Sequence, residues 1–108
     1  MVRLFAAACA RGDVAAAEAL LLPTAAAVCD GFPIPVGFGP GEVARLAIFL
    51  LSGQPDSTLT VEQVNGTPGL VLRRGGRVVT IAAVTCADDR IAALWFVLAQ
   101  EKLKFWNA

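Results

Sequence analysis

The sequence predicts an α+β domain in which a curved antiparallel sheet packs on about three N-terminal helices. The main observation is a second half in which runs rich in Val, Ile and Leu are separated by Asn65-Gly66, Gly75-Gly76 and Asp88-Asp89. These dipeptides accept positive φ and are typical of tight turns between consecutive antiparallel strands. The predicted strands cover residues 59–64, 69–73, 78–85 and 91–98.

The first half has helical spacing of apolar residues. Residues 2–10 and 14–22 are predicted as two short helices, the first ended by Gly12 and the second capped by Asp13. Residues 24–29 are apolar and fit either a strand or a buried link. Together these segments predict a bent helical pair followed by a chain segment that crosses the domain.

A linker rich in Gly and Pro follows at residues 30–40, and it cannot form a regular helix. Its apolar residues alternate, which predicts that it lies across an apolar surface; they are Phe32, Ile34, Val36 and Phe38. A third helix is predicted from Pro40 or Gly41 to Ser52-Gly53. Apolar residues surround most of this helix, so burial on more than one side is expected.

Composition and charge narrow the classes of protein. Of the 108 residues, 56% are apolar and only 17% are charged, which predicts a single compact domain over residues 1–108 with apolar surface left for an interface or a cavity. Nine basic and nine acidic residues cancel, so no overall field attracts nucleic acid or an anionic membrane. The apolar run 46–51 is too short to span a bilayer, and residues 11–13 interrupt any signal-peptide pattern. We therefore expect a cytoplasmic protein.

The cysteines do not predict a metal site. Cys9, Cys29 and Cys86 are widely spaced, and the chain has no histidine. A zinc site needs about four nitrogen or sulfur ligands at close spacing, so we predict neither a metal nor another cofactor. Ala, Val and Thr surround each cysteine, which predicts small buried apolar side chains.

Several motifs suggest a family. V-N-G-T-P-G-L-V at residues 64–71, G-R-V-V at 76–79 and R-I-A-A-L at 90–94 follow one another in the predicted sheet. They resemble the V-N-G-x-P-G-L-V, D-G-R-V and R-I-A-A-I elements of the SnoaL-like domain at the C-terminus of certain extracytoplasmic-function sigma factors. That domain belongs to the nuclear-transport-factor-two-like superfamily. The resemblance covers nearly the whole chain and implies the cone-shaped α+β fold.

Two elements depart from that pattern. The linker of the sigma-factor domain contains the element D-G-G-G-K, and this chain keeps only its first two residues, as Asp30-Gly31. The N-P-D-K-L ending of that domain is replaced here by A-Q-E-K-L at residues 99–103. The chain also has no second domain to bind promoter DNA. We therefore expect either a detached C-terminal domain or a free-standing relative.

The resemblance implies a non-catalytic ligand-binding or regulatory module similar to the accessory domain of such sigma factors, with transcription machinery as a partner if the chain is part of one. Two alternatives stay open. One is a small SnoaL-like isomerase, cyclase or hydrolase acting on an apolar small molecule in the cone cavity, and the other is a structural dimerisation domain. Both faces of residues 91–98 are apolar, which predicts a cover on each face and therefore a homodimer.

The enzyme alternative has few acid–base candidates, because the chain contains neither His nor Tyr. Asp30 is the weak catalytic candidate, since it precedes the apolar linker and fits a cavity mouth, although a turn aspartate explains it as well. We expect Asp88 and Asp89 to serve only in a hairpin turn. A catalytic role is therefore the less favoured expectation.

The predicted ligand-binding residues combine Asp30 with aromatic side chains that fit a cavity wall; they are Asp30, Phe32, Phe38, Phe49 and Trp95. Trp95 also fits a core position on the last strand. Three arginines, Arg73, Arg74 and Arg77, flank the Gly75-Gly76 hairpin. They could meet phosphates, but a solvated tip is the simpler interpretation at zero net charge.

Overall fold

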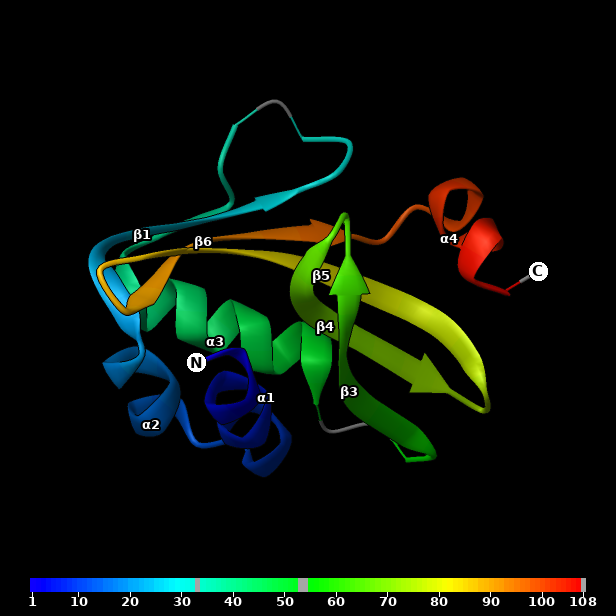
Figure 1. Ribbon diagram of the computed structural model, residues 1–108, viewed down its shortest axis with the longest axis horizontal. Helices are drawn as coiled ribbons and strands as arrows, with labels where there is room; N and C mark the ends of the chain where they lie inside the picture. Colours follow the sequence, from blue (N-terminus) through cyan, green and yellow to red (C-terminus); the bar gives the residue numbers. More distant parts are fainter. Residues whose placement is uncertain (33, 53–54, 108) are drawn as a thin grey trace.

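The computed structural model describes residues 1–32, 34–52 and 55–107. The elements, in chain order, are α1 (Val2–Arg11), α2 (Val14–Ala19), β1 (Leu21–Cys29), β2 (Gly37–Phe38), α3 (Gly39–Leu51), β3 (Ser57–Val64), β4 (Thr67–Arg74), β5 (Arg77–Ala87), β6 (Arg90–Val97) and α4 (Gln100–Asn107). The strands form one six-stranded sheet in the order β2-β1-β6-β5-β4-β3 (Figure 1). The predicted α+β architecture with a curved sheet is confirmed.

The two short N-terminal helices begin and end on the predicted signals. Gly12 takes a left-handed conformation, with φ at 69°, and ends α1. The Asp13 side chain accepts a hydrogen bond from the Ala16 N–H at 3.1 Å and caps α2. The predicted end of α2 was wrong, because Leu21 begins β1 instead of continuing the helix.

β1 resolves the ambiguity at residues 24–29. It is a strand, and it pairs with β6 in parallel, with Val28 opposite Trp95. The antiparallel meander expected from the sequence is therefore extended by one parallel pair and by the two-residue strand β2, whose Phe38 lies opposite Ala26.

Three of the four strands of the second half, β3, β4 and β5, are longer than predicted, and β6 keeps its predicted length but begins one residue earlier. Their turns lie where expected. Asn65, Asp88 and Asp89 all have positive φ, as have Gly66, Gly75 and Gly76. The segment 64–71 is a hairpin: Asn65 and Gly66 make its turn, and Thr67 Oγ1 donates to the Val64 carbonyl at 3.2 Å. The V-N-G-T-P-G-L-V motif therefore encodes a strand–turn–strand unit.

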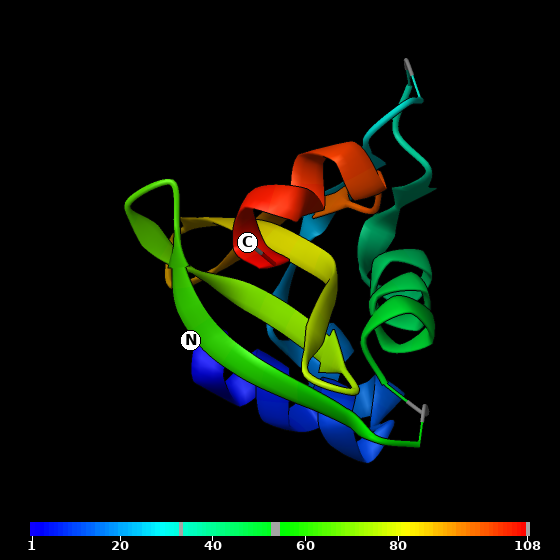
Figure 2. The ribbon, with the colours of Figure 1, turned by 90° about the vertical axis from the view of Figure 1, so that its right-hand side faces the viewer.

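The sheet separates two apolar clusters. The inner cluster lies under α1, α2 and α3, and its largest buried side chains are Phe5, Phe96 and Leu21. The outer cluster lies on the opposite face under α4, where Val71, Val78 and Ile81 of the sheet are buried with Leu103 of α4. Figure 2 shows α1 and α4 on opposite sides of the strands.

α3 and α4 differ from the expectations. Phe49 of α3 is 79% exposed, so this helix has an open face and is not buried all round. Gly53, which we expected to end it, lies outside the described residues. α4 was not predicted as a helix. Its Trp106 packs against the outer cluster, whereas its Phe105 is exposed.

Gly69 supplies a test of this packing. A Cβ at Gly69 would lie 2.7 Å from Val64 Cγ2 and 2.8 Å from the carbonyl oxygen of Ala82, which belongs to a neighbouring strand and cannot turn aside. We expect Gly69→Ala to lower the free energy of unfolding by about 1–3 kcal/mol. The measurement is urea denaturation followed by circular dichroism.

Gly37→Ala is the matched control, because a Cβ at Gly37 meets its nearest atom at an ordinary 3.8 Å. It should leave the denaturation midpoint close to that of the parent. Equal midpoints for the two variants would show that the Val64–Gly69 contact is wrong.

Candidate functional site

Asp30 follows the last residue of β1, and its side chain is only 3% exposed. One carboxylate oxygen accepts the N–H of Leu98 and the other accepts the N–H of Ala99, both at 3.0 Å. Lys102 Nζ lies 3.8 Å from Oδ2. The carboxylate is thus surrounded by donors from the segment that joins β6 to α4.

These partners determine the protonation of Asp30. Burial by itself would raise the pKa of the carboxyl group, but the hydrogen bonds from Leu98 and Ala99 and the charge of Lys102 outweigh it, so the pKa lies below its ordinary value. Asp30 is therefore ionised near neutral pH. It is a poor proton donor there, and its lone pairs are directed at backbone groups.

The arrangement explains what remains of the two altered motifs. Asp30 is the retained first residue of the D-G-G-G-K element, and Lys102 and Leu103 are the retained end of N-P-D-K-L. Asp30 and Lys102 form an ion pair, and Leu103 of α4 is buried against the sheet. The retained residues thus hold the last helix against the sheet.

The four aromatic candidates do not converge with Asp30 on one cavity. Phe32 and Phe38 of the linker region are exposed, and Phe49 is exposed on α3. Trp95 is 55% exposed on the outer face of β6, so it is neither a core residue nor a wall of the inner cluster. None of these residues lines the pocket that the described residues form between α1 and the sheet.

That pocket is open, has a volume of about 720 Å³, and lies between the start of α1 and the strands β3, β4 and β5. Val61 and Val84, which pack against the inner cluster, form part of its apolar wall. Arg3, Gln63 and Cys86 add polar atoms. The pocket thus opens on the helix-covered side of the sheet.

The sequence analysis missed this pocket, because its lining comes from three separate parts of the chain. The sequence places Val61 and Gln63 on the same face of a strand, and this was the one sign of a shared surface. It did not indicate that the start of α1 faces these two residues across the pocket. The lining also includes Val2 of α1 and two residues of β4, Thr67 and Pro68.

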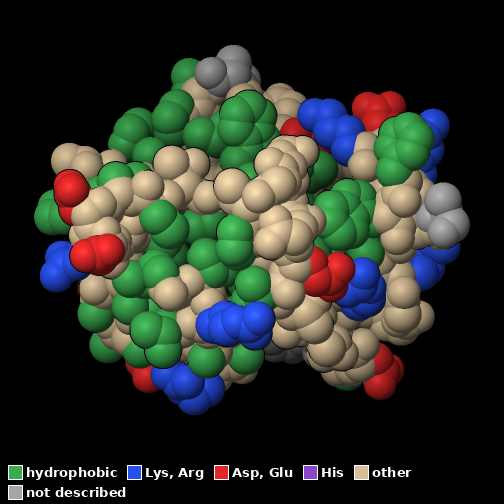
Figure 3. All heavy atoms as spheres, viewed as in Figure 1, with side chains coloured by type: hydrophobic (Ala, Val, Ile, Leu, Met, Phe, Trp, Pro, Cys, Tyr) green, Lys and Arg blue, Asp and Glu red, His purple; other side chains and the backbone are tan. Residues whose placement is uncertain are grey.

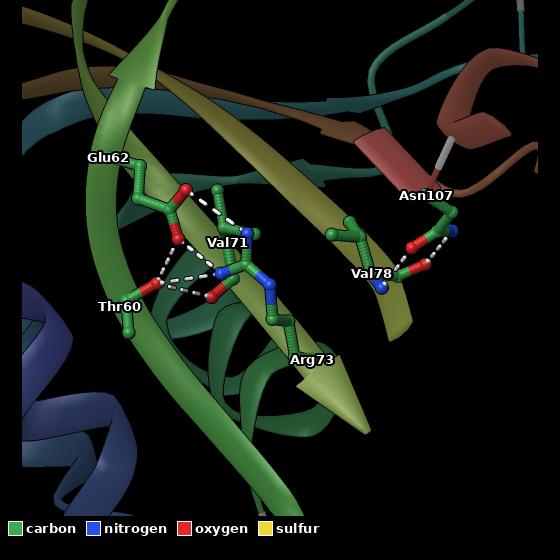
Figure 4. Close-up of polar contacts among 6 residues, drawn as sticks. All are labelled: Thr60, Glu62, Val71, Arg73, Val78 and Asn107. Carbon is green, nitrogen blue, oxygen red and sulfur yellow. Dashed lines mark hydrogen bonds and ion pairs between the residues drawn. The ribbon is translucent and has the colours of Figure 1, made fainter. Parts of the chain in front are cut away.

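Glu62, at the rim of this pocket, belongs to a polar cluster with Thr60 and Arg73 (Figure 4). The Arg73 guanidinium donates to both Glu62 oxygens, and Thr60 Oγ1 donates to Glu62 at 2.5 Å. The hydrogen bond from Arg73, helped by the one from Thr60, lowers the pKa of the Glu62 carboxyl. Glu62 is therefore ionised and paired, and it is poorly suited to deliver a proton near neutral pH.

The cysteines divide into two kinds. Cys9 and Cys29 are buried as predicted, and burial raises the pKa of the Cys9 thiol to about 12 and also raises that of Cys29. The prediction was wrong for Cys86, which is exposed at the pocket. Among the described residues, no group of His, Cys, Asp and Glu is assembled in a way that could hold a metal ion.

Replacement of Asp30 tests its anchoring role. Asp30→Asn keeps the shape but places an amide NH₂ against a backbone N–H, and we expect the free energy of unfolding to fall by about 1–3 kcal/mol at pH 7. Because the folded pKa is lowered, the contribution of Asp30 is present above its unfolded pKa of about 3.9 and is lost as the pH falls through the folded value. The difference between parent and variant should therefore shrink below about pH 4.

The control is Asp88→Asn, which removes the same charge from an exposed turn. It should leave stability nearly unchanged across this pH range. A loss as large as that of Asp30→Asn, or a constant difference down to pH 2, would contradict the anchoring role.

Comparison with known proteins gives a likeness of fold. No protein-family model matches the sequence, and no curated protein matches it. Among solved structures, the extracytoplasmic-function sigma factor SigJ of Mycobacterium tuberculosis is 24% identical with a TM-score of 0.66, and the match covers 94% of this chain and 41% of that one. This chain thus spans less than half the length of the sigma factor.

Two other neighbours are similar over most of both chains. An epoxide hydrolase of Mycobacterium tuberculosis is 16% identical with a TM-score of 0.58, covering 96% of this chain and 84% of that chain. An NTF2-like protein of unknown function from Burkholderia xenovorans is 12% identical with a TM-score of 0.62, covering 90% and 80%. No described helix is both long and apolar enough to cross a membrane. The chain has the NTF2-like cone fold, as the SnoaL-like resemblance implied.

Proposed function

We propose that this domain is a non-catalytic module that binds an apolar small molecule in the pocket between α1 and β3–β5. The observation that carries the proposal is the state of its carboxylates. Asp30 and Glu62 are both held in hydrogen-bonded pairs that lower their pKa values. General acid catalysis near neutral pH needs a carboxyl group whose pKa is raised toward 7, and these two groups are shifted the other way.

The pocket supports binding by its size and lining. Its volume of about 720 Å³ lies in the range typical of small-molecule sites. Apolar walls with a few polar groups, here Arg3 and Gln63, favour an apolar ligand that carries one or two oxygen atoms. A cytoplasmic location fits this role, and it remains a proposal.

The regulatory form of the proposal rests on the sigma-factor neighbour. Its likeness extends over nearly all of this chain, and the Asp30–Lys102 pair joins the remains of two motifs of that domain. We therefore propose a contact with transcription machinery in the setting of a longer sigma factor. The epoxide hydrolase neighbour has the same fold, so the fold alone does not favour regulation over chemistry.

We also propose that a second copy of the chain covers the outer face of the sheet. Phe38 lies opposite Ala26, and Val28 opposite Trp95, so these side chains share that face. Phe38 is 64% exposed and Trp95 is 55% exposed, although large apolar side chains next to one another are normally covered. Figure 3 shows hydrophobic side chains gathered over the linker and the neighbouring edge of the sheet.

Filling the pocket tests the binding site. Titration with the apolar ketone menthone, followed by amide NMR, should shift signals of Val61, Val84 and Cys86. Val84→Trp occupies the pocket and should weaken binding at least about tenfold. Thr85→Trp is the matched control, because the neighbouring side chain of the same strand points to the opposite face.

Two results would contradict this proposal. One is menthone binding that Val84→Trp leaves unchanged. The other is saturable turnover of an epoxide, a ketosteroid or a polyketide-like ketone that is lost in Glu62→Gln or Asp30→Asn while the fold stays intact. The second result would favour the enzyme alternative.

Light scattering tests the second copy. At micromolar concentration the parent should show about twice the chain mass, whereas Trp95→Ser combined with Phe38→Ser should show a monomer. Phe49→Ser, which replaces an even more exposed aromatic on α3, should remain dimeric. A monomeric parent would exclude the dimer.

A further inference from the structure

A second pocket, separate from the one proposed for the apolar ligand, lies where the start of β5 meets α4. Its volume is about 300 Å³. Arg77 of β5 and Lys104 of α4 line it, together with the side chains of Gln100 and Asn107. The two cations are 27 positions apart in the sequence, from 77 to 104, so only the folding of α4 onto the sheet brings them to one pocket.

Both cations are free of acidic partners. Among the described residues, neither Arg77 nor Lys104 forms an ion pair, whereas Arg73 is held by Glu62 and Lys102 by Asp30. No acidic residue is part of the lining, and Glu101, the acid of α4 nearest in sequence, does not contribute to it. Figure 3 shows Lys and Arg side chains around α4. The pocket therefore combines two positive charges that have no acidic partner, although Lys104 Nζ lies 5.7 Å from the centre of the Phe105 ring.

The floor of this pocket is fixed by α4. Asn107 Oδ1 accepts the Val78 N–H at 2.7 Å, and Asn107 Nδ2 donates to the Val78 carbonyl at 3.0 Å (Figure 4). Leu103 is buried in the outer cluster between the two ends of the helix. Because α4 is attached at Asp30 and again at Val78, Arg77 and Lys104 are carried by elements held in one relative position.

The remaining lining gives the ligand a second requirement. The half-buried residues Val79 and Leu98 add apolar surface beside the charged groups. The side chain of Gln100 has no hydrogen-bond partner among the described residues, so its amide is available to a ligand. A site with two cations, one free amide and an apolar floor fits a dianion that carries a small apolar group.

We propose that this pocket binds a small phosphate monoester, with the phosphate held by Arg77 and Lys104 and the apolar group resting beside Leu98. Arg77 presents a planar fork of donors that matches phosphate oxygens, and Lys104 adds a point charge from the opposite wall. The volume is at the small end for ligand sites, which selects a compact ligand. A bound phosphate would also bridge β5 and α4.

The test uses phenyl phosphate as the probe, with inorganic phosphate and benzoate for comparison. Titration is followed by amide NMR, and shifts are expected at Val78, Val79 and Leu103. Phenyl phosphate should bind more tightly than benzoate, which carries one charge, and more tightly than inorganic phosphate, which has no apolar group. Raising the salt concentration should weaken binding.

Variants locate the charges. Arg77→Gln and Lys104→Gln should each weaken phenyl phosphate binding at least about tenfold. Arg74→Gln is the matched control: it removes the same charge from the residue opposite Arg77 in the hairpin, but Arg74 does not line the pocket. It should change the affinity less than about twofold, because an exposed charge outside the site acts only through screened interactions.

The outcomes are decisive in both directions. No shift at millimolar phenyl phosphate, equal binding of benzoate, or equal losses in Arg74→Gln and Arg77→Gln would overturn the proposal. The parent should also gain thermal stability with phenyl phosphate, and Lys104→Gln should lose that gain while keeping the parent spectrum in the absence of probe. Menthone binding at the other pocket is independent of these results, so failure of either site can be recognised separately.

Discussion

The burial of one ionised carboxylate organises the C-terminal third of this domain. Asp30 stands at the end of β1, and its two oxygens accept the N–H groups that lead from β6 into α4. A buried charge is tolerated only when it is paired and hydrogen-bonded, and Asp30 meets both conditions with two backbone donors and Lys102. The position of α4, and with it the cover of the outer cluster, depends on this arrangement.

The same anchoring decides which parts of the outer sheet face are open. α4 covers the region of Val71, Val78 and Ile81. The pairing of β6 with β5 ends at Val97 and Ile81, and beyond that point the Asn107 side chain hydrogen-bonds to the Val78 backbone. The region of Trp95 lies outside this cover and is exposed. One face of a single sheet thus provides part of the core, a charged pocket beside α4 and an apolar surface.

The fold is used differently on its two sides. The helix-covered side holds the larger pocket, whose neighbouring carboxylate Glu62 is neutralised by Arg73. The α4 side holds the smaller pocket, where Arg77 and Lys104 have no such partner. The paired charges of Glu62 and Arg73 contribute to stability, whereas the charges of Arg77 and Lys104, which have no acidic partner, are available for a ligand.

Much of the fold could be predicted from the sequence, because local rules specify it. Positive φ at Asn65, the Asp13 cap and the Gly12 end of α1 need no distant contact, and the hairpin at residues 64–71 is encoded within its own motif. The α+β class follows from these local signals and from apolar periodicity. The parallel pairing of β1 with β6 joins strands that are far apart in the chain, and no local pattern specifies it.

The candidate sites could be predicted only in part. Sequence reasoning selected Asp30 and the three hairpin arginines, but it could not distinguish a catalytic carboxylate from one that accepts backbone N–H groups, because those donors belong to Leu98 and Ala99. Nor could it separate Arg73, which Glu62 neutralises, from Arg77, which lies beside Lys104. The sequence by itself determined the residue types, the turns and the class of fold. Tertiary structure alone decided which charges have partners, because a charge is neutralised by its neighbours in space.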